Sequence, residues 1–267
     1  MNAGRKPPRR EVAPGGWPRV RESSETSGTR PRERERDRPP LRDVDVGVAS
    51  ISRARRPGAA KAGRIVIITA NSPEFVAAKA GAAKTFGTNP LCFACPVEGR
   101  EPFVFDMSTA AIALFGVLTC KAKGLPLPEK SAYDADGNFT TKVEDIPVGG
   151  GQGAIAGWGG HKGVGIALMV ELLCAALAGG AVLGKEKKGA AKNWGHHIVC
   201  IDPAAHVDGF EARAASIIKT IAESHPDGVR LPGDASNKIA ATNAASGTIP
   251  VPKKIWDVIC ETAASAK

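Results

Sequence analysis

The sequence predicts an α/β fold, in which strands and helices are mixed along the chain. After residue 60, short β-branched or aromatic runs occur among longer runs with helical periodicity. Two of the short runs, 91–95 and 102–106, lie close enough together to form a strand pair. No G-x-G-x-x-G motif follows a strand, so the standard dinucleotide-binding fold is not indicated.

The first 60 residues differ in composition from the rest of the chain. The whole chain has 36 Lys and Arg against 27 Asp and Glu, a formal charge of +9. Residues 1–60 carry +7 of this charge, and residues 61–267 carry +2. The first segment also holds eight Pro and only one Leu and one Ile, which is too little apolar surface to offset the ordering entropy. We therefore expect a disordered Arg/Pro-rich tail over 1–60 and a folded domain over 61–267.

The composition of the tail also bears on other interpretations. An RNA-binding arm is one alternative, because Arg suits phosphate geometry. However, no aromatic residue follows Trp17 within the tail to stack on bases, so we expect no nucleic-acid partner. Eight acidic residues argue against a transit peptide, and no apolar run resembles a secretory signal. Arg outnumbers Lys 14 to one in the tail but is outnumbered 17 to four after it, which suggests a separate origin as an artefact of the gene model.

The first half of the folded part reads as strands joined by turns. Residues 64–69 are β-branched and predict a buried strand, and turns follow at 70–73 and 86–90. The predicted strand pair then leads into a helical run over 110–123, for which Ser108 or Thr109 is the natural N-cap. Residues 134–138 predict another turn.

A Gly-rich loop over 149–160 leads into a long apolar run over 164–183. The length of this run raises the question of a membrane span. Glu171 in its middle and several small residues near its end instead predict a buried core helix. We expect no contact with a membrane.

Three further elements are expected towards the C-terminus. They are a strand at 198–201, an amphipathic helix capped by Asp208 and running from Phe210 past Ile221, and a C-terminal helix that contains Ile255, Val258 and Ile259.

The segment Gly159-Gly-His-Lys-Gly163 is the best local candidate for a ligand site. Glycines allow a ligand to approach the backbone, the start of the following helix supplies unpaired N–H groups, and Lys162 adds a positive charge. Together these features suit a phosphate or a carboxylate. A Gly-rich turn with a solvated Lys162 remains the alternative.

Two other residues are candidates for ligand contact. Asp106, at a strand end beside a helix start, could accept hydrogen bonds from ribose hydroxyls or act as a helix cap. Ser72, in the loop after the first strand, could donate to a ligand or form a turn.

Metal chemistry is not expected. Cys92-Phe-Ala-Cys95 lies in a predicted strand, where positions i and i+3 face opposite sides, and no second C-x-x-C occurs. The five His show no zinc spacing. Walker, G-x-S-x-G and H-E-x-x-H motifs are absent from the sequence.

Eight groups of short motifs occur in a set order between residues 62 and 256. They are Ala62-Gly-Arg-Ile65 with Asn71-Ser72, Phe86-Gly-Thr-Asn-Pro90, Phe103-Val-Phe-Asp-Met-Ser-Thr109, Gly124-Leu-Pro-Leu-Pro128, Asp134-Ala-Asp-Gly-Asn-Phe-Thr-Thr141, Gly159-Gly-His-Lys-Gly163 with Ala167-Leu-Met-Val-Glu-Leu172, Ile201-Asp-Pro203, and Gly247-Thr-Ile-Pro250 with Trp256. Each motif is weak alone, but the ordered set resembles the type-2 malate/L-lactate dehydrogenase family. Relatives of that family include ureidoglycolate, sulfolactate and piperideine-carboxylate oxidoreductases. The resemblance covers about residues 61–267.

The resemblance implies a non-Rossmann NAD(P)-binding fold with a largely antiparallel mixed sheet flanked by helices. It also implies a cytoplasmic homodimer that transfers a hydride between NAD or NADP and a 2-hydroxy/2-oxo acid. By motif position, it implies that the cofactor-binding residues are Ser72, Asp106, Met107, Ser108, Lys162 and Asn193.

The sequence departs from the family at the catalytic position. The family's catalytic His lies upstream in a Ser-x-His-x-Gly segment and acts as general acid/base toward the substrate oxygen. Here 45–52 only vaguely resembles that strand, Arg53-Ala-Arg-Arg-Pro57 follows it, and no His precedes His161. We therefore assign no catalytic residue. Two functions stay open: an oxidoreductase of this family, and a catalytically inactive truncated relative that at most binds the cofactor.

Overall fold

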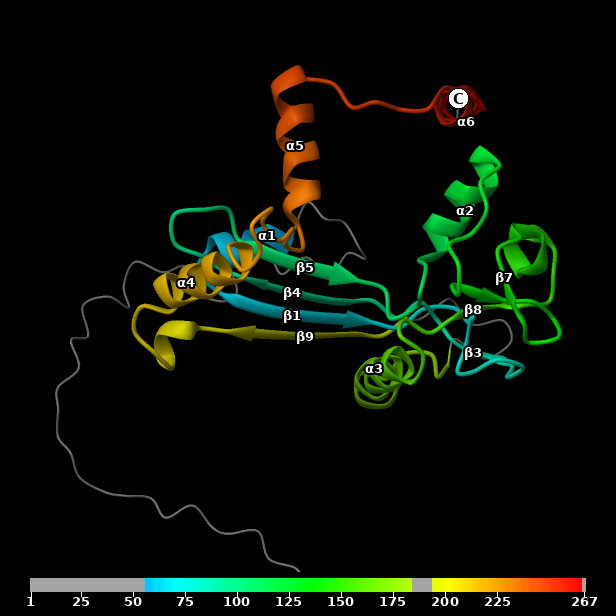
Figure 1. Cartoon of the computed structure of the whole chain (residues 1–267), viewed down its shortest axis with the longest axis horizontal. Coiled ribbons are helices and arrows are strands. Elements are labelled where there is room, and N and C mark those ends of the chain that lie inside the picture. Colours follow the sequence, from blue (N-terminus) through cyan, green and yellow to red (C-terminus); the bar gives the residue numbers. More distant parts are fainter. Residues whose placement is uncertain (1–55, 184–193, 266–267) are drawn as a thin grey trace, which may run out of the picture. The chain divides into compact units, whose positions relative to one another are not determined.

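The strands of the computed structural model, which describes residues 56–183 and 194–265, form two sheets. Sheet A has the order β5-β4-β1-β9, and all its neighbouring strands are antiparallel. Its strands are β1 (Ile65–Ala70), β4 (Leu91–Cys95), β5 (Phe103–Met107) and β9 (His196–Ile201). Strand β1 lies inside the sheet, where Ile67 is opposite Phe93 on one side and Val199 on the other (Figure 1). The predicted strands near 64–69, 91–95, 102–106 and 198–201 are thus confirmed.

Sheet B is smaller and mixed. It has the order β3-β2-β8-β6-β7, and only the β2–β8 pair is parallel. Its strands are β2 (Val76–Ala77), β3 (Lys84–Phe86), β6 (Ala132–Tyr133), β7 (Phe139–Thr140) and β8 (Ala154–Ala156). The predicted α/β class with largely antiparallel mixed pairing is confirmed, with the strands divided between two sheets.

Helices cover both faces of sheet A because its strands alternate their side chains between the two faces. On one face, Val66 packs with Ala59 of α1 (Arg56–Lys61). On the other, Ile65 belongs to a cluster with Phe210 and Ala214 of α4 (Phe210–Ala222). The two helices bury the apolar side chains of the sheet end that lies away from the candidate site.

A separate apolar core holds sheet B. Val76 and Ile155 of the parallel strand pair are buried there with Val117 of α2 (Leu114–Lys123) and Ile146. Ile146 lies between two short 3-10 helices, η3 (Val143–Asp145) and η4 (Pro147–Gly149). Ala167 of α3 (His161–Glu171) joins this core, so α3 is anchored to sheet B.

The long apolar run differs from the predicted buried helix. Helix α3 starts at His161, before the run, and gives way after Glu171 to a π-helical segment, η5 (Leu172–Leu177). Leu168, Met169 and Leu172 are exposed, so only one side of the helix is buried. Within the described part of the chain, no helix combines the length and the apolar content that crossing a membrane requires.

One predicted helix start and two predicted helix caps are wrong. The helix expected from residue 110 starts at Leu114, because Ala110 stays extended in a bridge to Gly157. The expected cap Ser108 instead accepts a hydrogen bond from the Ala110 N–H in a turn. Helix α4 starts after Gly209, whose left-handed φ of 67° makes the turn, and no side chain, that of Asp208 included, caps it.

Three further elements complete the described residues. They are η6 (Pro203–Ala205), α5 (Asp234–Ser246) and α6 (Lys253–Ser265). Helix α6 confirms the predicted C-terminal helix. The Gly-rich loop predicted over 149–160 contains strand β8 in its middle. The disordered tail was predicted over 1–60; residues 1–55 lie outside the described residues, and 56–60 belong to α1.

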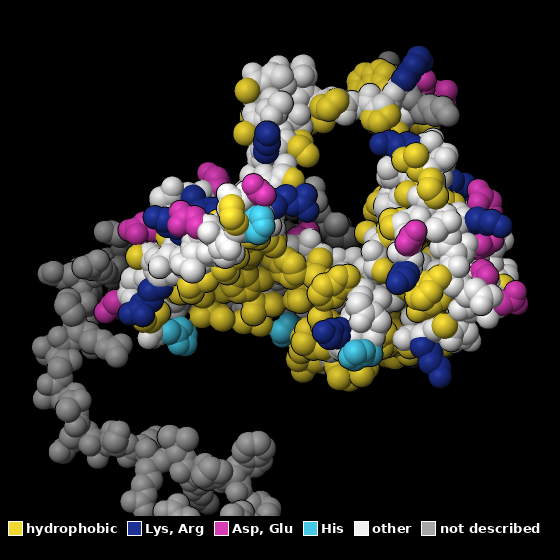
Figure 2. Space-filling model, viewed as in Figure 1, with side chains coloured by type: hydrophobic (Ala, Val, Ile, Leu, Met, Phe, Trp, Pro, Cys, Tyr) yellow, Lys and Arg dark blue, Asp and Glu magenta, His cyan; other side chains and the backbone are white. Residues whose placement is uncertain are grey.

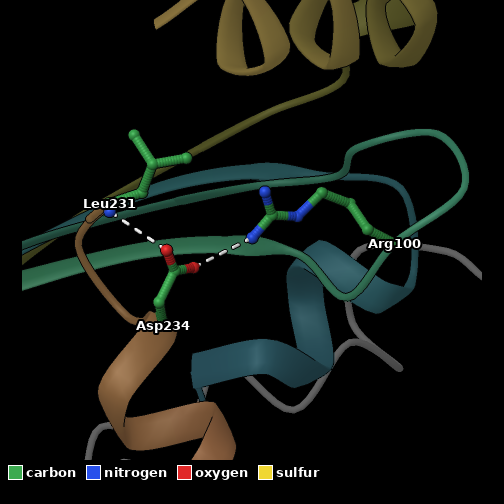
Figure 3. Close-up of polar contacts among 3 residues, drawn as sticks. All are labelled: Arg100, Leu231 and Asp234. Atoms are coloured by element: carbon green, nitrogen blue, oxygen red, sulfur yellow. Dashed lines mark hydrogen bonds and ion pairs between the residues drawn. The ribbon is translucent and has the colours of Figure 1, made fainter. Parts of the chain in front are cut away.

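Helix α5, which the sequence analysis did not predict, is tied to the β4–β5 loop by an ion pair. Arg100 Nη2 lies 3.3 Å from Asp234 Oδ1, and Asp234 Oδ2 accepts a hydrogen bond from the Leu231 N–H at 3.0 Å (Figure 3). Both charged side chains are partly exposed, so the pair contributes about 1 kcal/mol at most. The rest of α5 buries no side chain.

The sheet B core makes a prediction about stability. Ile155 is 1% exposed and packs between β2 and β6, so Ile155→Ala should lower the free energy of unfolding by about 2–5 kcal/mol through lost burial and a residual cavity. Ile217→Ala is the matched control, because Ile217 is 61% exposed and its loss should cost less than about 0.5 kcal/mol. Urea unfolding followed by circular dichroism measures both. Equal losses would contradict the assignment of the core.

Candidate functional site

A buried polar cluster joins the loops at one end of sheet A to helix α3. It consists of Asn71, Asn89 and Glu171, which are 2%, 0% and 5% exposed. We call these three residues the carboxamide cluster. Glu171 Oε1 accepts a hydrogen bond from Asn89 Nδ2 at 2.9 Å, and Oε2 accepts from Asn71 Nδ2 at 3.3 Å and from the Leu183 N–H at 3.2 Å. Both oxygens of the buried carboxylate are therefore satisfied.

The amide oxygens of the two Asn are also occupied. Asn71 Oδ1 accepts from the Gly195 N–H at 2.8 Å, and Asn89 Oδ1 accepts from the Ser72 N–H at 3.2 Å. Asn89 has a positive φ of 34°, a conformation that Asn adopts more readily than most residues. The cluster thus ties together the loop after β1, the loop before β4, and the backbone at residues 183 and 195.

The candidate residues Ser72 and Ser108 meet at Thr88. Ser72 Oγ lies 3.4 Å from Thr88 Oγ1, and Ser108 Oγ donates to the Thr88 carbonyl at 2.9 Å. The Thr109 N–H donates to the same carbonyl at 3.0 Å. A Cβ on Gly87 would collide with the Ser72 carbonyl, so glycine permits this approach of the two loops.

The first turn of α3 lies against the same junction. The Trp158 N–H donates to the Thr109 carbonyl at 2.9 Å, and the Gly163 N–H donates to the Trp158 carbonyl at 2.8 Å. A Cβ on Gly163 would collide with the backbone of both Trp158 and Thr109, so this glycine is a packing requirement. Lys162 is exposed on the same turn. The structure therefore brings the Gly-rich helix start next to the loop that carries Ser108.

The remaining candidate residues lie at the end of β5. Asp106 is opposite Cys92 in the β4–β5 register and is exposed, and Met107 is half-buried opposite Leu91. Both directly precede Ser108. Asn193 lies outside the described residues, although Gly195, two positions later, is held by Asn71.

The sequence analysis missed the carboxamide cluster. It treated Glu171 as an interruption of an apolar run and the Asn residues as turn formers. A carboxylate in the middle of an apolar run is a usable signal, because a buried charge requires hydrogen-bonding partners. The identity of those partners could not be read from sequence, since Asn71 and Asn89 lie 100 and 82 positions away.

A buried thiol lies beside the cluster. Cys174 Sγ is 3.3 Å from Thr69 Oγ1, and both side chains are almost fully buried. Burial raises the pKa of Cys174, although the hydrogen bond with Thr69 acts in the opposite direction. The thiol is therefore protonated near neutral pH and packs as a small apolar group. Among the residues that the structure describes, no three His, Cys, Asp or Glu gather as metal ligands would.

Comparison with known proteins identifies the class and then the family. The relatives of this chain are described as dehydrogenases and reductases. A family model described as malate/L-lactate dehydrogenase matches residues 51–260, and the chain belongs to this family. The resemblance seen in the ordered motifs is confirmed.

Three relatives illustrate the likeness. The (2R)-3-sulfolactate dehydrogenase (NADP(+)) of Chromohalobacter salexigens is 33% identical over 196 residues, which cover 72% of this chain and 57% of the relative. A malate dehydrogenase of Pyrococcus horikoshii is 31% identical over 217 residues, with coverages of 77% and 60%. The crystal structure of a delta1-piperideine-2-carboxylate reductase from Pseudomonas syringae pvar. tomato matches with a TM-score of 0.66 and 32% identity, covering 76% of this chain and 61% of that one. The chain thus spans about three fifths of these relatives.

Two glycines of α3 offer a matched test of the junction. Gly163→Ala should lower the free energy of unfolding by about 1–3 kcal/mol, because the new Cβ meets the backbone of Trp158 and Thr109. Gly165→Ala, two positions later, has open space around its Cβ and should be neutral or stabilising by up to about 1 kcal/mol. Urea unfolding curves measure both variants. If Gly163→Ala proved as stable as Gly165→Ala, α3 would not pack against the junction as described.

Proposed function

We propose that this chain is an NAD(P)-dependent oxidoreductase that transfers a hydride between the nicotinamide cofactor and a 2-hydroxy/2-oxo acid. The observation that carries the proposal is the meeting of Ser72 and Ser108 at Thr88, with the first turn of α3 against Thr109. The Ser72 hydroxyl, the exposed Lys162 and a helix N-terminus then lie on neighbouring segments. Such a set of donors suits the phosphates of a dinucleotide.

The open glycines at the start of α3 support this fit. Gly159 and Gly160 have positive φ values of 59° and 64°, and a Cβ on either would meet no atom within 4 Å. A ligand can therefore approach the backbone there, where the first N–H groups of the helix carry a partial positive charge. In the proposed complex, Lys162 adds a full charge on the same turn.

Each proposed binding residue has a role that follows from its chemistry. The Ser72 hydroxyl can donate to the ligand, and the exposed Asp106 carboxylate can accept hydrogen bonds from ribose hydroxyls. The Ser108 O–H donates to the Thr88 carbonyl, so its oxygen can only accept from the ligand. Met107 supplies an apolar contact, and Asn193 belongs to the proposed set by motif position. The bound cofactor supplies the hydride chemistry, and the protein supplies its position and its electrostatic surroundings.

The alternative function is a catalytically inactive relative that at most binds the cofactor. The observation in its favour is that the first His of the sequence is His161. Hydride transfer to or from an alcohol carbon needs a group that moves the hydroxyl proton, and an imidazole suits this task near neutral pH. We assign no residue to this step.

We also propose that the domain over 61–267 pairs with a second copy of itself, in the cytoplasm, as the family resemblance implies. Support comes from the broad apolar area beside α4 on sheet A (Figure 2) and from the exposed Leu168, Met169 and Leu172. Exposed apolar surface of this extent is typical of interfaces.

The proposed cofactor site predicts saturable binding of NADH or NADPH. Binding should quench tryptophan fluorescence, because Trp158 lies in the loop that enters α3. Lys162→Ala should weaken binding about tenfold, which corresponds to the roughly 1.5 kcal/mol of one charge-assisted hydrogen bond. Isothermal titration calorimetry gives the dissociation constants.

Lys219→Ala is the matched control, because Lys219 is an exposed lysine of α4 and its loss should leave the affinity unchanged. Absence of binding at millimolar dinucleotide would rule out the cofactor site. Equal affinities of the Lys162→Ala variant and the unchanged protein would move the phosphate site elsewhere.

Turnover separates the two candidate functions. With malate, lactate, 3-sulfolactate or Δ1-piperideine-2-carboxylate as substrate, absorbance at about 340 nm follows the nicotinamide. The sequence has no His before His161 that could act as the upstream general acid/base. We therefore expect turnover to be absent, or about 10²–10⁴-fold slower than that of an enzyme with a positioned general acid/base. Rates typical of an efficient dehydrogenase would show that another group, such as His161, moves the proton.

A further inference from the structure

We propose that Glu171 is a positioning residue for the cofactor site. Its carboxylate accepts hydrogen bonds from the side-chain amides of Asn71 and Asn89, and the Asn89 amide oxygen in turn accepts from the Ser72 N–H. The inference rests on the proposed function for the identity of the ligand. The arrangement of Glu171 and the two amides can be tested without any ligand.

The side-chain amides of Asn71 and Asn89 each have a fixed orientation. Each amide oxygen already accepts a backbone N–H, from Gly195 in the case of Asn71 and from Ser72 in the case of Asn89. Neither amide can therefore rotate by half a turn without losing that hydrogen bond. The Asn89 NH₂ consequently donates to Glu171 at 2.9 Å and approaches the Ala167 carbonyl at 3.4 Å. The Asn71 NH₂ donates to the Ala181 carbonyl at 2.7 Å and to Glu171 at 3.3 Å. Position 171 therefore has to supply one acceptor oxygen to each amide.

A carboxylate is the side chain that meets this requirement. Its Oε1 faces one amide donor, and its Oε2 faces the other together with the Leu183 N–H. A glutamine at this position would place an NH₂ group against at least one of these buried donors. An aspartate would be shorter by one methylene and would not reach both amides.

The carboxamide cluster is connected by hydrogen bonds to the proposed ligand-binding residues Ser72 and Ser108. The Ser72 N–H donates to Asn89 Oδ1, and the Asn89 N–H approaches Ser72 Oγ at 3.4 Å. These two contacts fix both the backbone and the hydroxyl of Ser72 next to Thr88, whose carbonyl holds Ser108. The other amide holds the backbone at Gly195. Loss of the carboxylate should therefore loosen the Ser72 loop and the backbone at Gly195 together.

The reciprocal pair of substitutions Glu171→Gln and Asn89→Asp distinguishes a positioning role of Glu171 from a general contribution to the stability of the fold. In the double variant, the new glutamine can donate its NH₂ to the new aspartate while its oxygen still accepts from Asn71 and Leu183. The other oxygen of that aspartate still accepts from the Ser72 N–H. The polarity of the hydrogen bond between positions 89 and 171 is reversed, and the buried negative charge is kept. The 3.4 Å contact from position 89 to the Ala167 carbonyl is lost. Each single variant leaves two donors or two acceptors facing each other.

The experiment measures NADH affinity by calorimetry and backbone amide hydrogen exchange in the full chain. Glu171→Gln should weaken binding about tenfold and speed exchange at Ser72, Leu183 and Gly195, while exchange within β4 stays unchanged. The double variant should recover most of both losses. Glu129→Gln, the same change at an exposed position, should alter neither.

Two results would overturn the inference: unchanged exchange at these three amides in Glu171→Gln, or a double variant no better than the single ones. If Glu171→Gln does not fold, the test is whether the double variant regains a cooperative unfolding transition. Recovery supports the inference, and no recovery overturns it. If the unchanged protein binds no NADH, the proposed function fails, and the exchange pattern with its recovery alone decides the role of Glu171.

Discussion

The hydrogen bonds of the Glu171 carboxylate are the constraint on which the candidate site depends. A carboxylate that is only 5% exposed is costly to bury unless polar partners replace the water it loses. Three N–H donors from three different segments do this here. Because the buried charge needs all three donors, the segments that carry them must come together. The loop after β1, the loop before β4 and the chain beyond η5 are joined at one point for this reason.

A second constraint is the close approach of neighbouring backbone segments, which only glycine permits at several positions. Around the cluster, Gly87, Gly163 and Gly195 each lie where a Cβ would strike a carbonyl oxygen of another segment. In the Gly159–Gly163 motif the glycines therefore have different roles. Gly159 and Gly160 keep the backbone open to the outside, whereas Gly163 lets α3 lie against Thr109. A motif that reads as uniformly Gly-rich thus combines access for a ligand with close packing.

The extent to which sequence predicts this molecule follows from the range of the interactions. Strands β1, β4, β5 and β9 could be predicted because β-branched and aromatic runs express a local preference. The start of α2 and the cap of α4 could not, since a bridge to Gly157 keeps Ala110 extended and a left-handed Gly209 replaces a side-chain cap. Helix α5 escaped prediction because Ile239 is its one large apolar residue. For the site, motif order indicated Ser72, Ser108 and Lys162, but hydrogen bonds across 82 to 124 positions had no local signature.

The central place of β1 in sheet A has a consequence for how the chain folds. Strand β1 is made early in synthesis, but one of its two neighbours, β9, includes residues 196–201 and emerges much later. Until then the β9 side of β1 is an unpaired apolar edge, and the loop closure that joins the two strands is long. Such non-local pairing slows folding and exposes intermediates to aggregation. The pairing of β1 with β9 therefore keeps an apolar strand edge exposed until residues 196–201 have been synthesised.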